Sequence, residues 1–293
     1  MKGKSLYIFI AGSAILFGTM EVALKTVSTS LDPFQVTFLR FLFGGIVLLP
    51  FAINEYRSKP KGFMTKRLWL TQVFLGGAVL PSSMTLYQFA VMGANASTVA
   101  IIFCTNPVFT MLIAHLMTED EKLNRLKILA LALGAVGLVL LIHPWEIQEG
   151  NTLAGALLSL ATSAIFGLYN VISGKNINRV GAYTQVSSNF LIGSLVLFCL
   201  LQFLGRPVFE GVGDHLGVVL YVSAAVTGGG YLLYFFAMKR SNATTASTVF
   251  FLKPVIAPIF AVILLGEVIT YNMYIGIALV LTASYILIFR KNK

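Results

Sequence analysis

The feature that most constrains this chain is a series of apolar stretches, each long enough to cross a lipid bilayer as a helix. A hydrocarbon core of about 30 Å requires roughly 20 apolar residues in helical conformation. Only 11% of the 293 residues are charged and 57% are hydrophobic. The chain is therefore predicted to be an all-α integral membrane protein in contact with the lipid bilayer. Windows of about 19 residues predict ten transmembrane helices, at residues 6–27, 34–53, 68–90, 96–117, 126–143, 153–173, 183–204, 216–238, 244–265 and 271–289.

The basic residues lie in alternate loops between these stretches. If the N-terminus is cytoplasmic, the cytoplasmic segments hold 17 of the 21 Lys and Arg residues. Cytoplasmic loops of membrane proteins carry such an excess. We therefore expect a multi-pass plasma membrane protein with both termini in the cytoplasm. The net charge of +10 is interpreted as a topology signal, so no nucleic acid partner is expected.

The two halves of the sequence resemble each other. The segment NASTVAIIFCTNPVF begins at Asn95 and NATTASTVFFLKPVI begins at Asn242, a separation of 242 − 95 = 147. The same separation relates Tyr87 to Tyr234, one predicted helix earlier. A separation of 149 relates the pair Phe17-Gly18 to the pair Phe166-Gly167.

This similarity predicts two repeats of five helices each, at residues 1–147 and 148–293. Because five is an odd number, the second repeat must cross the membrane in the opposite direction. Inverted-topology repeats are common in secondary transporters, which alternate between outward-open and inward-open forms around a site near the midplane.

Particular motifs in this order resemble the EamA-type family of the drug/metabolite transporter superfamily. They are FGTMEVALK from Phe17, the Arg40-Phe41 pair, and LLYFFAMKRSNATTASTVFFLKPVIAPIFAVILLGE from Leu232 to Glu267. The resemblance implies a ten-helix secondary transporter of amino acids, related metabolites or organic cations, often working in export. Phe17 departs from the family pattern, which usually has tryptophan there.

Two charged residues fall within the first two predicted helices. Burying a charge near the bilayer centre costs about 2.5–3.5 kcal/mol on the lenient insertion scale, so such residues need a partner or a task. Glu21 and Arg40 lie at similar depth on consecutive helices, which predicts either a structural ion pair or a Glu21 that binds a substrate ammonium or a coupling proton. Glu21 also departs from the family pattern, which is usually apolar or small there. The repeat counterparts, Asn170 and Asn189, are neutral.

A third charged residue, Lys253, lies near the middle of the ninth predicted helix, and its repeat counterpart Asn106 lies near the middle of the fourth. Each is followed by a proline, Pro254 or Pro107, which removes a backbone donor and predicts a kink that faces protein or water rather than lipid. Lys253 is expected to hold a substrate carboxylate or to exchange partners with Glu21.

Further candidates are polar, aromatic and glycine residues near these positions, and two tyrosines close to opposite membrane faces. Lys253, Asn106 and Glu21 are expected to bind the substrate together with neighbouring residues, which include a glycine where the eighth helix is expected to bend. The two tyrosines are expected to act as gates. The substrate-contact candidates are Asn170, Phe17, Tyr169, Phe250 and Gly229, and the gating candidates are Tyr87 and Tyr234.

These residues favour a secondary active transporter of a small-molecule substrate, with an amino acid or related zwitterion as the leading class. No phosphate-binding loop or zinc-protease motif is present, and the histidines are not spaced with other ligands, so we expect no cofactor, no metal and no enzymatic activity. Energy would come from a proton, another ion or the substrate's own gradient. The alternatives are a carrier of organic cations or amines that uses Glu21 and aromatic faces, or a non-transporting membrane receptor or membrane-embedded enzyme. The residues leave the oligomeric state open.

Overall fold

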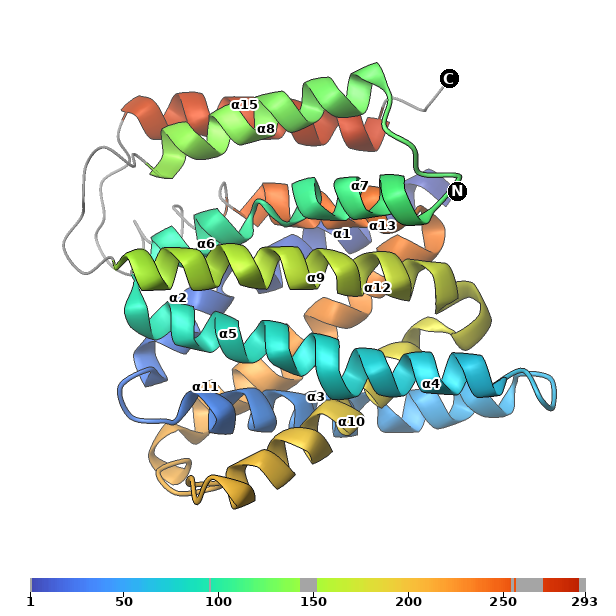
Figure 1. The fold of residues 1–293 in the computed structure, drawn as a ribbon, viewed down its shortest axis with the longest axis vertical. Helices are drawn as coiled ribbons and strands as arrows, with labels where there is room; N and C mark the ends of the chain where they lie inside the picture. Colours follow the sequence, from blue (N-terminus) through green and yellow to red (C-terminus); the bar gives the residue numbers. More distant parts are fainter. Residues whose placement is uncertain (1, 95, 143–151, 254–255, 257–270, 290–293) are drawn as a thin grey trace.

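The computed structural model describes the chain except for residues 1, 95, 143–151, 254–255, 257–270 and 290–293 (Figure 1). All regular secondary structure in these described ranges is helical, because a helix in lipid satisfies its own backbone groups. Five segments are long and apolar enough to cross a membrane, namely Ser5–Val27, Pro33–Arg57, Leu153–Val180, Ala182–Phe203 and Gly213–Arg240. The predicted all-α membrane class is confirmed, and the count of ten spans stays a prediction.

Helical segments occur within each predicted span, and the first, fourth and ninth spans are each divided by a break. The elements are α1 (Lys2–Gly18), α2 (Met20–Val27), α3 (Pro33–Arg57), α4 (Lys66–Phe74), η1 (Leu75–Val79), α5 (Leu80–Gly93), α6 (Ala96–Phe103), α7 (Asn106–Met117), α8 (Arg125–Ile142), α9 (Leu153–Val180), α10 (Ala182–Phe203), η2 (Gly213–His215), α11 (Leu216–Leu220), η3 (Tyr221–Gly230), α12 (Tyr231–Arg240), α13 (Ala243–Ser247) and α15 (Tyr271–Phe289). The predicted ninth span is described as α13 and the helical residues 249–253.

Polar side chains begin four of these helices. Asp32, Thr65, Thr152 and Asn242 each accept a hydrogen bond from a backbone N–H in the first turn of α3, α4, α9 or α13. The first N–H groups of a helix have no partner within the helix, so a side-chain acceptor satisfies one of them. These caps therefore fix where four helices start.

Large apolar side chains lie on the outside of the bundle. Trp69, Leu153 and Phe203 are 57%, 77% and 84% exposed, whereas Glu21 and Lys253 are buried. A soluble protein would expose the charges and bury these rings and chains. The distribution is that of a protein whose outer surface contacts lipid.

The connections alternate between the two ends of the bundle. The start of α1 and the loops that follow α3 and α7 lie at one end, and the loops that follow α2 and α10 lie at the opposite end (Figure 1). This alternation is what one crossing per predicted span requires. The assignment of the first end to the cytoplasm rests on the basic residues.

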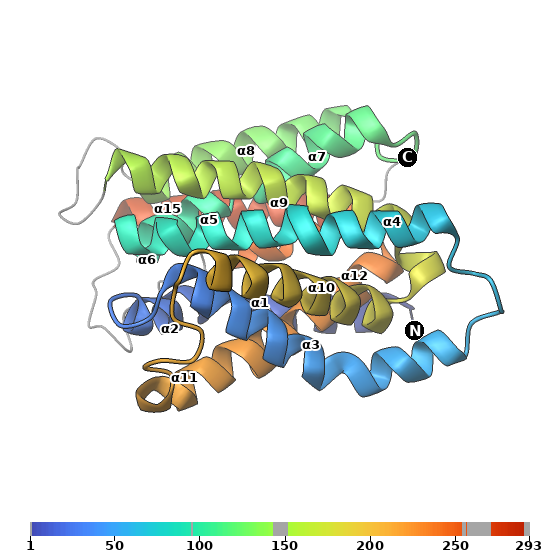
Figure 2. The ribbon, with the colours of Figure 1, turned by 60° about the horizontal axis from the view of Figure 1, so that its bottom comes forward.

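Helices of one half pack against helices of the other half, and the pairs are related by symmetry. The second helices of the halves, α3 and α10, pack against each other (Figure 2), and so do the fifth, α8 and α15 (Figure 1). The first helix of each half packs against the third of the other, as α1 with α12 and α9 with α5. A twofold axis between the halves produces such a pattern.

Counterpart residues of the two halves also contact each other. Phe41 stacks on Phe190 with ring centroids 5.1 Å apart, and Phe103 meets Phe250 edge to face at 5.3 Å. The residue numbers differ by 149 and by 147, the separations found in the sequence. A residue can touch its own counterpart only close to a twofold axis. The contacts support the inverted arrangement, and the division at residues 147 and 148 stays a prediction.

Wide-turn π-helical segments interrupt the third and eighth predicted spans at counterpart positions. The first residue of η1 is Leu75, and 75 + 147 = 222 falls within η3. Each segment contains consecutive glycines. The π-helix is rare and occurs mostly as single turns inserted in α-helices, so its presence in both halves is a second mark of their similarity.

Gly76 in η1 allows a close crossing with α10. A Cβ atom on Gly76 would lie 2.8 Å from both Cα and O of Asn189, whereas one on neighbouring Gly77 would have its nearest contact at 3.6 Å. We therefore expect Gly76→Ala to destabilise the folded protein by about 1–3 kcal/mol, the usual range for an overpacked contact. Thermal unfolding in detergent measures the effect.

The matched control is Gly77→Ala, which should unfold close to the parent temperature. Equal melting temperatures for the two variants would show that the crossing is looser than described.

Candidate functional site

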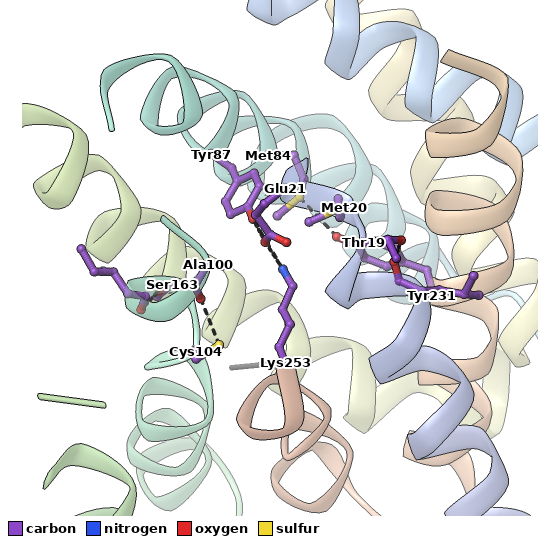
Figure 3. A network of polar contacts seen from close by, with 12 residues as sticks. Thr19, Met20, Glu21, Met84, Tyr87, Ala100, Cys104, Ser163, Tyr231 and Lys253 are labelled. Atoms are coloured by element: carbon purple, nitrogen blue, oxygen red, sulfur yellow. Dashed lines mark hydrogen bonds and ion pairs between the residues drawn. The ribbon is translucent and has the colours of Figure 1, made fainter. Parts of the chain in front are cut away.

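Three buried side chains from separate helices form a charged centre (Figure 3). Nζ of Lys253, in residues 249–253, donates to Oε1 of Glu21 in α2. The hydroxyl of Tyr87 in α5 donates to the same oxygen, and Lys253 Nζ lies 3.5 Å from the tyrosine oxygen. Glu21 is 2% exposed and the other two are 0% exposed. We name Glu21, Tyr87 and Lys253 the charged triad.

The triad replaces the predicted ion pair between Glu21 and Arg40. Arg40 instead donates from Nε to Thr227 Oγ1 at 3.2 Å and from Nη2 to Met20 Sδ at 3.2 Å. Arg40 lies close to Glu21 along α2, since it contacts the neighbouring Met20, but position along a helix does not fix which face a side chain occupies. The carboxylate of Glu21 points toward Tyr87 and Lys253, while Arg40 reaches η3.

Aromatic rings complete the surroundings of the lysine. Lys253 Nζ lies 5.3 Å from the centroid of Phe103 and 5.7 Å from that of Tyr87. A cation over an aromatic face is attracted by the ring quadrupole, more strongly where water is excluded. The ammonium is therefore held by one carboxylate and two ring faces. An organic ammonium ion would find the same partners.

A second contact between the halves repeats this one with neutral side chains. Asn170 Nδ2 donates to Asn106 Oδ1 at 3.0 Å and to Thr110 Oγ1 at 3.3 Å, and Asn106 Nδ2 donates to Ser163 O at 3.0 Å. Asn170 corresponds to Glu21 (170 − 21 = 149) and Asn106 corresponds to Lys253 (253 − 106 = 147). An ion pair joins the halves at one place, and an amide pair joins them at the counterpart place.

The contact between Arg40 and Met20 is repeated in the same way. Their counterparts are Asn189 and Tyr169, and Asn189 Nδ2 donates to the Tyr169 hydroxyl oxygen at 3.1 Å. The predicted substrate contact Tyr169 is therefore engaged with Asn189. The two halves share one contact geometry and differ in charge.

Aromatic rings fill the space between the two polar sites. Phe250 stacks on Phe17 at 5.5 Å and meets Phe103 and Phe166 at 5.3 and 5.4 Å. Tyr234 lies 5.5 Å from the same ring. The rings close the middle of the protein in this structure, and the predicted wall residues Phe17 and Phe250 lie at their centre.

Two candidate residues, Gly229 and Tyr234, make no side-chain hydrogen bond to the charged triad among the described residues. Gly229 is only partly buried, and a Cβ atom there would lie 3.8 Å from both Ala224 O and Leu16 Cδ1, so the structure does not bring it to the charged triad. The hydroxyl of Tyr234 is buried without a hydrogen-bond partner among the described residues. Tyr87 is a member of the triad, and the gating role expected of Tyr87 and Tyr234 stays a prediction.

The proline predictions differ in outcome. A break separates α6 from α7 just before Pro107, with Asn106 as the first residue of α7, so the predicted kink is confirmed. Pro254 lies outside the described residues.

The sequence reasoning missed Phe166 and Thr227 as partners of the site. The alignment of Phe166 with Phe17 was a signal for the first, whereas no pattern marked the second.

Comparison with known proteins agrees with this architecture. The sequence pattern of the EamA-like transporter family matches residues 4–143 and again residues 153–289. The chain belongs to the EamA-like transporter family. This confirms the resemblance to drug/metabolite transporters and identifies a multi-pass membrane protein that is a transporter by family. Its relatives' names point to transport rather than to an enzyme.

Relatives of this EamA-like chain span nearly all of its length. A Clostridium kluyveri protein described as an uncharacterized transporter is 36% identical over 296 residues, covering 97% of this chain and 93% of that protein. A WAT1-related chloroplastic protein of Arabidopsis thaliana is 26% identical, covering 93% of this chain and 67% of that protein. One crystal structure, 18% identical, covers 97% of both chains with a TM-score of 0.76 and shares the fold.

Removing one member of the buried ion pair should destabilise this transporter more than removing both. Lys253→Met leaves the carboxylate of Glu21 buried without its cation, and breaking a buried pair costs about 3–5 kcal/mol. The double variant Glu21→Gln with Lys253→Met contains no unpaired charge at this place. We expect it to melt closer to the parent protein in detergent than Lys253→Met does.

Tyr87→Phe is the control, because it removes a hydrogen bond and leaves both charges in place. A double variant that melts no higher than Lys253→Met would contradict the described pairing.

Proposed function

We propose that this chain is a secondary active transporter of a small zwitterionic metabolite such as an amino acid. It works by alternating access in the plasma membrane, and the direction expected from the family resemblance is export. The observation that carries the proposal is the ion pair of Glu21 and Lys253, buried where helices of the two halves meet. Substrate identity, direction and mechanism are all part of the proposal.

A zwitterion suits this site because it carries both charges that the pair carries. A buried ion pair contributes little net stability, since desolvation offsets its attraction. A substrate ammonium can take the place of the Lys253 ammonium at Glu21, while the substrate carboxylate accepts from Lys253. The exchange leaves no charge unpaired in the protein interior, so opening the pair is cheap only when substrate is present.

The contact between Glu21 and Lys253 and its neutral counterpart between Asn170 and Asn106 differ in how strongly they hold the helices together. Separating the helices at Glu21 and Lys253 breaks a buried ion pair, whereas separating them at Asn170 and Asn106 breaks hydrogen bonds between amides. Net hydrogen bonds between neutral groups contribute about 0.5–1.5 kcal/mol each. We therefore assign the charged side as the gate that requires substrate or a proton on Glu21.

A carrier of organic cations is the second candidate. It is favoured by one observation, the position of Lys253 Nζ between the carboxylate of Glu21 and the faces of Phe103 and Tyr87. An amine substrate could occupy this position alone, with Lys253 displaced as a structural or proton-linked charge. The two candidates differ in whether the substrate needs a carboxylate.

Transport by the purified protein in proteoliposomes tests the proposal. We expect the parent protein to exchange a radiolabelled amino acid across the membrane. Lys253→Ala should insert and remain in the membrane but lose exchange, because the carboxylate loses its cation and Glu21 is unpaired. Thermal shift identifies the ligand to label, since a ligand at 100 times its Kd raises apparent stability by about 2.7 kcal/mol.

Exchange of amines without amino acids would select the second candidate. Normal exchange by Lys253→Ala would remove the lysine from the site, and a protein that exchanges neither class would overturn the proposal.

A further inference from the structure

The described interior holds a second cation without an acidic partner. Arg40 is 1% exposed, and among the described residues its hydrogen-bond partners are Thr227 and Met20. Glu21, the acidic residue next to Met20 in the chain, is paired with Lys253. The described charged side chains at this depth therefore comprise two cations and one anion.

The guanidinium of Arg40 has unused donor capacity. A guanidinium carries five N–H donors and no acceptor. Nε is used by Thr227 and Nη2 by a methionine sulfur, which is a weak acceptor, while Nη1 is buried with no partner in the part of the chain that the structure describes. A buried charge without full hydrogen bonding is costly, so an anion that filled this position would be bound strongly.

A small cavity lies next to these donors. Arg40 and Ser223 share its lining with seven aliphatic side chains, Leu24, Val27, Val36, Leu39, Val218, Val219 and Val222. Ser223 Oγ is also buried and unpartnered among the described residues. The lining comes from α2, α3, α11 and η3, and the cavity of about 10 Å³ has room for no more than a water-sized group. Binding of a carboxylate therefore requires one of these helices to shift. Two hydrogen-bond donors in an apolar wall suit a single carboxylate.

The counterpart place between the halves lacks these donors. Asn189 stands at the position of Arg40 and Gly76 at the position of Ser223 (223 − 76 = 147). An amide and a glycine supply no positive charge and no hydroxyl group. Binding of an anion is therefore restricted to the place formed by Arg40 and Ser223.

We infer that Arg40, together with Ser223, binds the carboxylate of the transported molecule before the ion pair of Glu21 and Lys253 opens. The inference rests on the proposed transport function and assigns a residue to one end of the substrate. Arg40 presents a planar fork that matches a carboxylate, whereas Lys253 already donates to Glu21. Glu21 follows Met20, which Arg40 contacts, and its Oε2 is buried and unpartnered among the described residues, so an acceptor for the substrate ammonium lies close to Arg40.

The test compares each of the common α-amino acids with its carboxamide, which keeps the ammonium and replaces the carboxylate by a neutral amide. Thermal shift of the purified protein is measured in sulfate buffer, with sodium chloride alone as a separate probe. We expect at least one amino acid to stabilise the parent protein and its amide to bind at least about tenfold more weakly, equivalent to 1.4 kcal/mol. This comparison uses no variant, so it does not depend on how a variant folds.

Variants then assign the preference to Arg40. Arg40→Gln and Ser223→Ala should reduce or abolish the preference for acid over amide, and Arg40→Lys should retain part of it. The matched control is Arg206→Gln, which removes an exposed arginine paired with Asp32 at 2.5 Å and should keep the full preference. A preference that survives in Arg40→Gln would overturn the assignment.

Other outcomes separate this inference from the proposed function. Equal binding of acid and amide, with exchange retained in proteoliposomes, overturns the carboxylate site and leaves transport standing. Stabilisation by chloride alone, lost in Arg40→Gln and not exceeded by any amino acid, assigns the site to an inorganic anion and overturns the inference. Absence of exchange for acids and amines alike overturns the transport function itself.

Discussion

The arrangement of the centre depends on the interaction between Glu21 and Lys253 in an interior that excludes water. Neither charge is stable there alone, because desolvation costs several kcal/mol per ion. Their pairing ties α2 of the first half to the ninth predicted span in the second half, and Tyr87 adds α5. Helices distant in sequence are thus held at one point by a contact that a charged ligand can compete for.

The halves combine a shared geometry with different chemistry. Phe41 against Phe190 and Phe103 against Phe250 place counterpart rings in contact, which requires close helix crossings such as the one at Gly76. At the polar positions the same geometry holds an ion pair at one contact between the halves and Asn170 with Asn106 at the counterpart contact. The frame is thus common to both contacts, and a few side chains produce the asymmetry of charge.

The sequence predicted the fold class and the identity of the important side chains better than their partners. Apolar length and the placement of basic residues predict membrane helices because lipid imposes one simple requirement on every span. The internal repeat predicted that Lys253 and Asn106 occupy equivalent positions. For Glu21 the sequence left both Arg40 and Lys253 open as partners, and the structure shows Lys253; the choice depends on tertiary packing that no local pattern encodes. Phe166 was detectable by alignment, and Thr227 was not.

The paired π-helical segments have a mechanical consequence. A π turn widens the helix and disturbs its regular ladder of backbone bonds, so η1 and η3 are points where each half bends with little loss. Since they occupy counterpart positions, both halves are compliant along the backbone at the same place in their third helices. Any preference for one shape over another must then come from side chains, and the ion pair of Glu21 and Lys253 opposite the amide pair of Asn170 and Asn106 is the largest such difference.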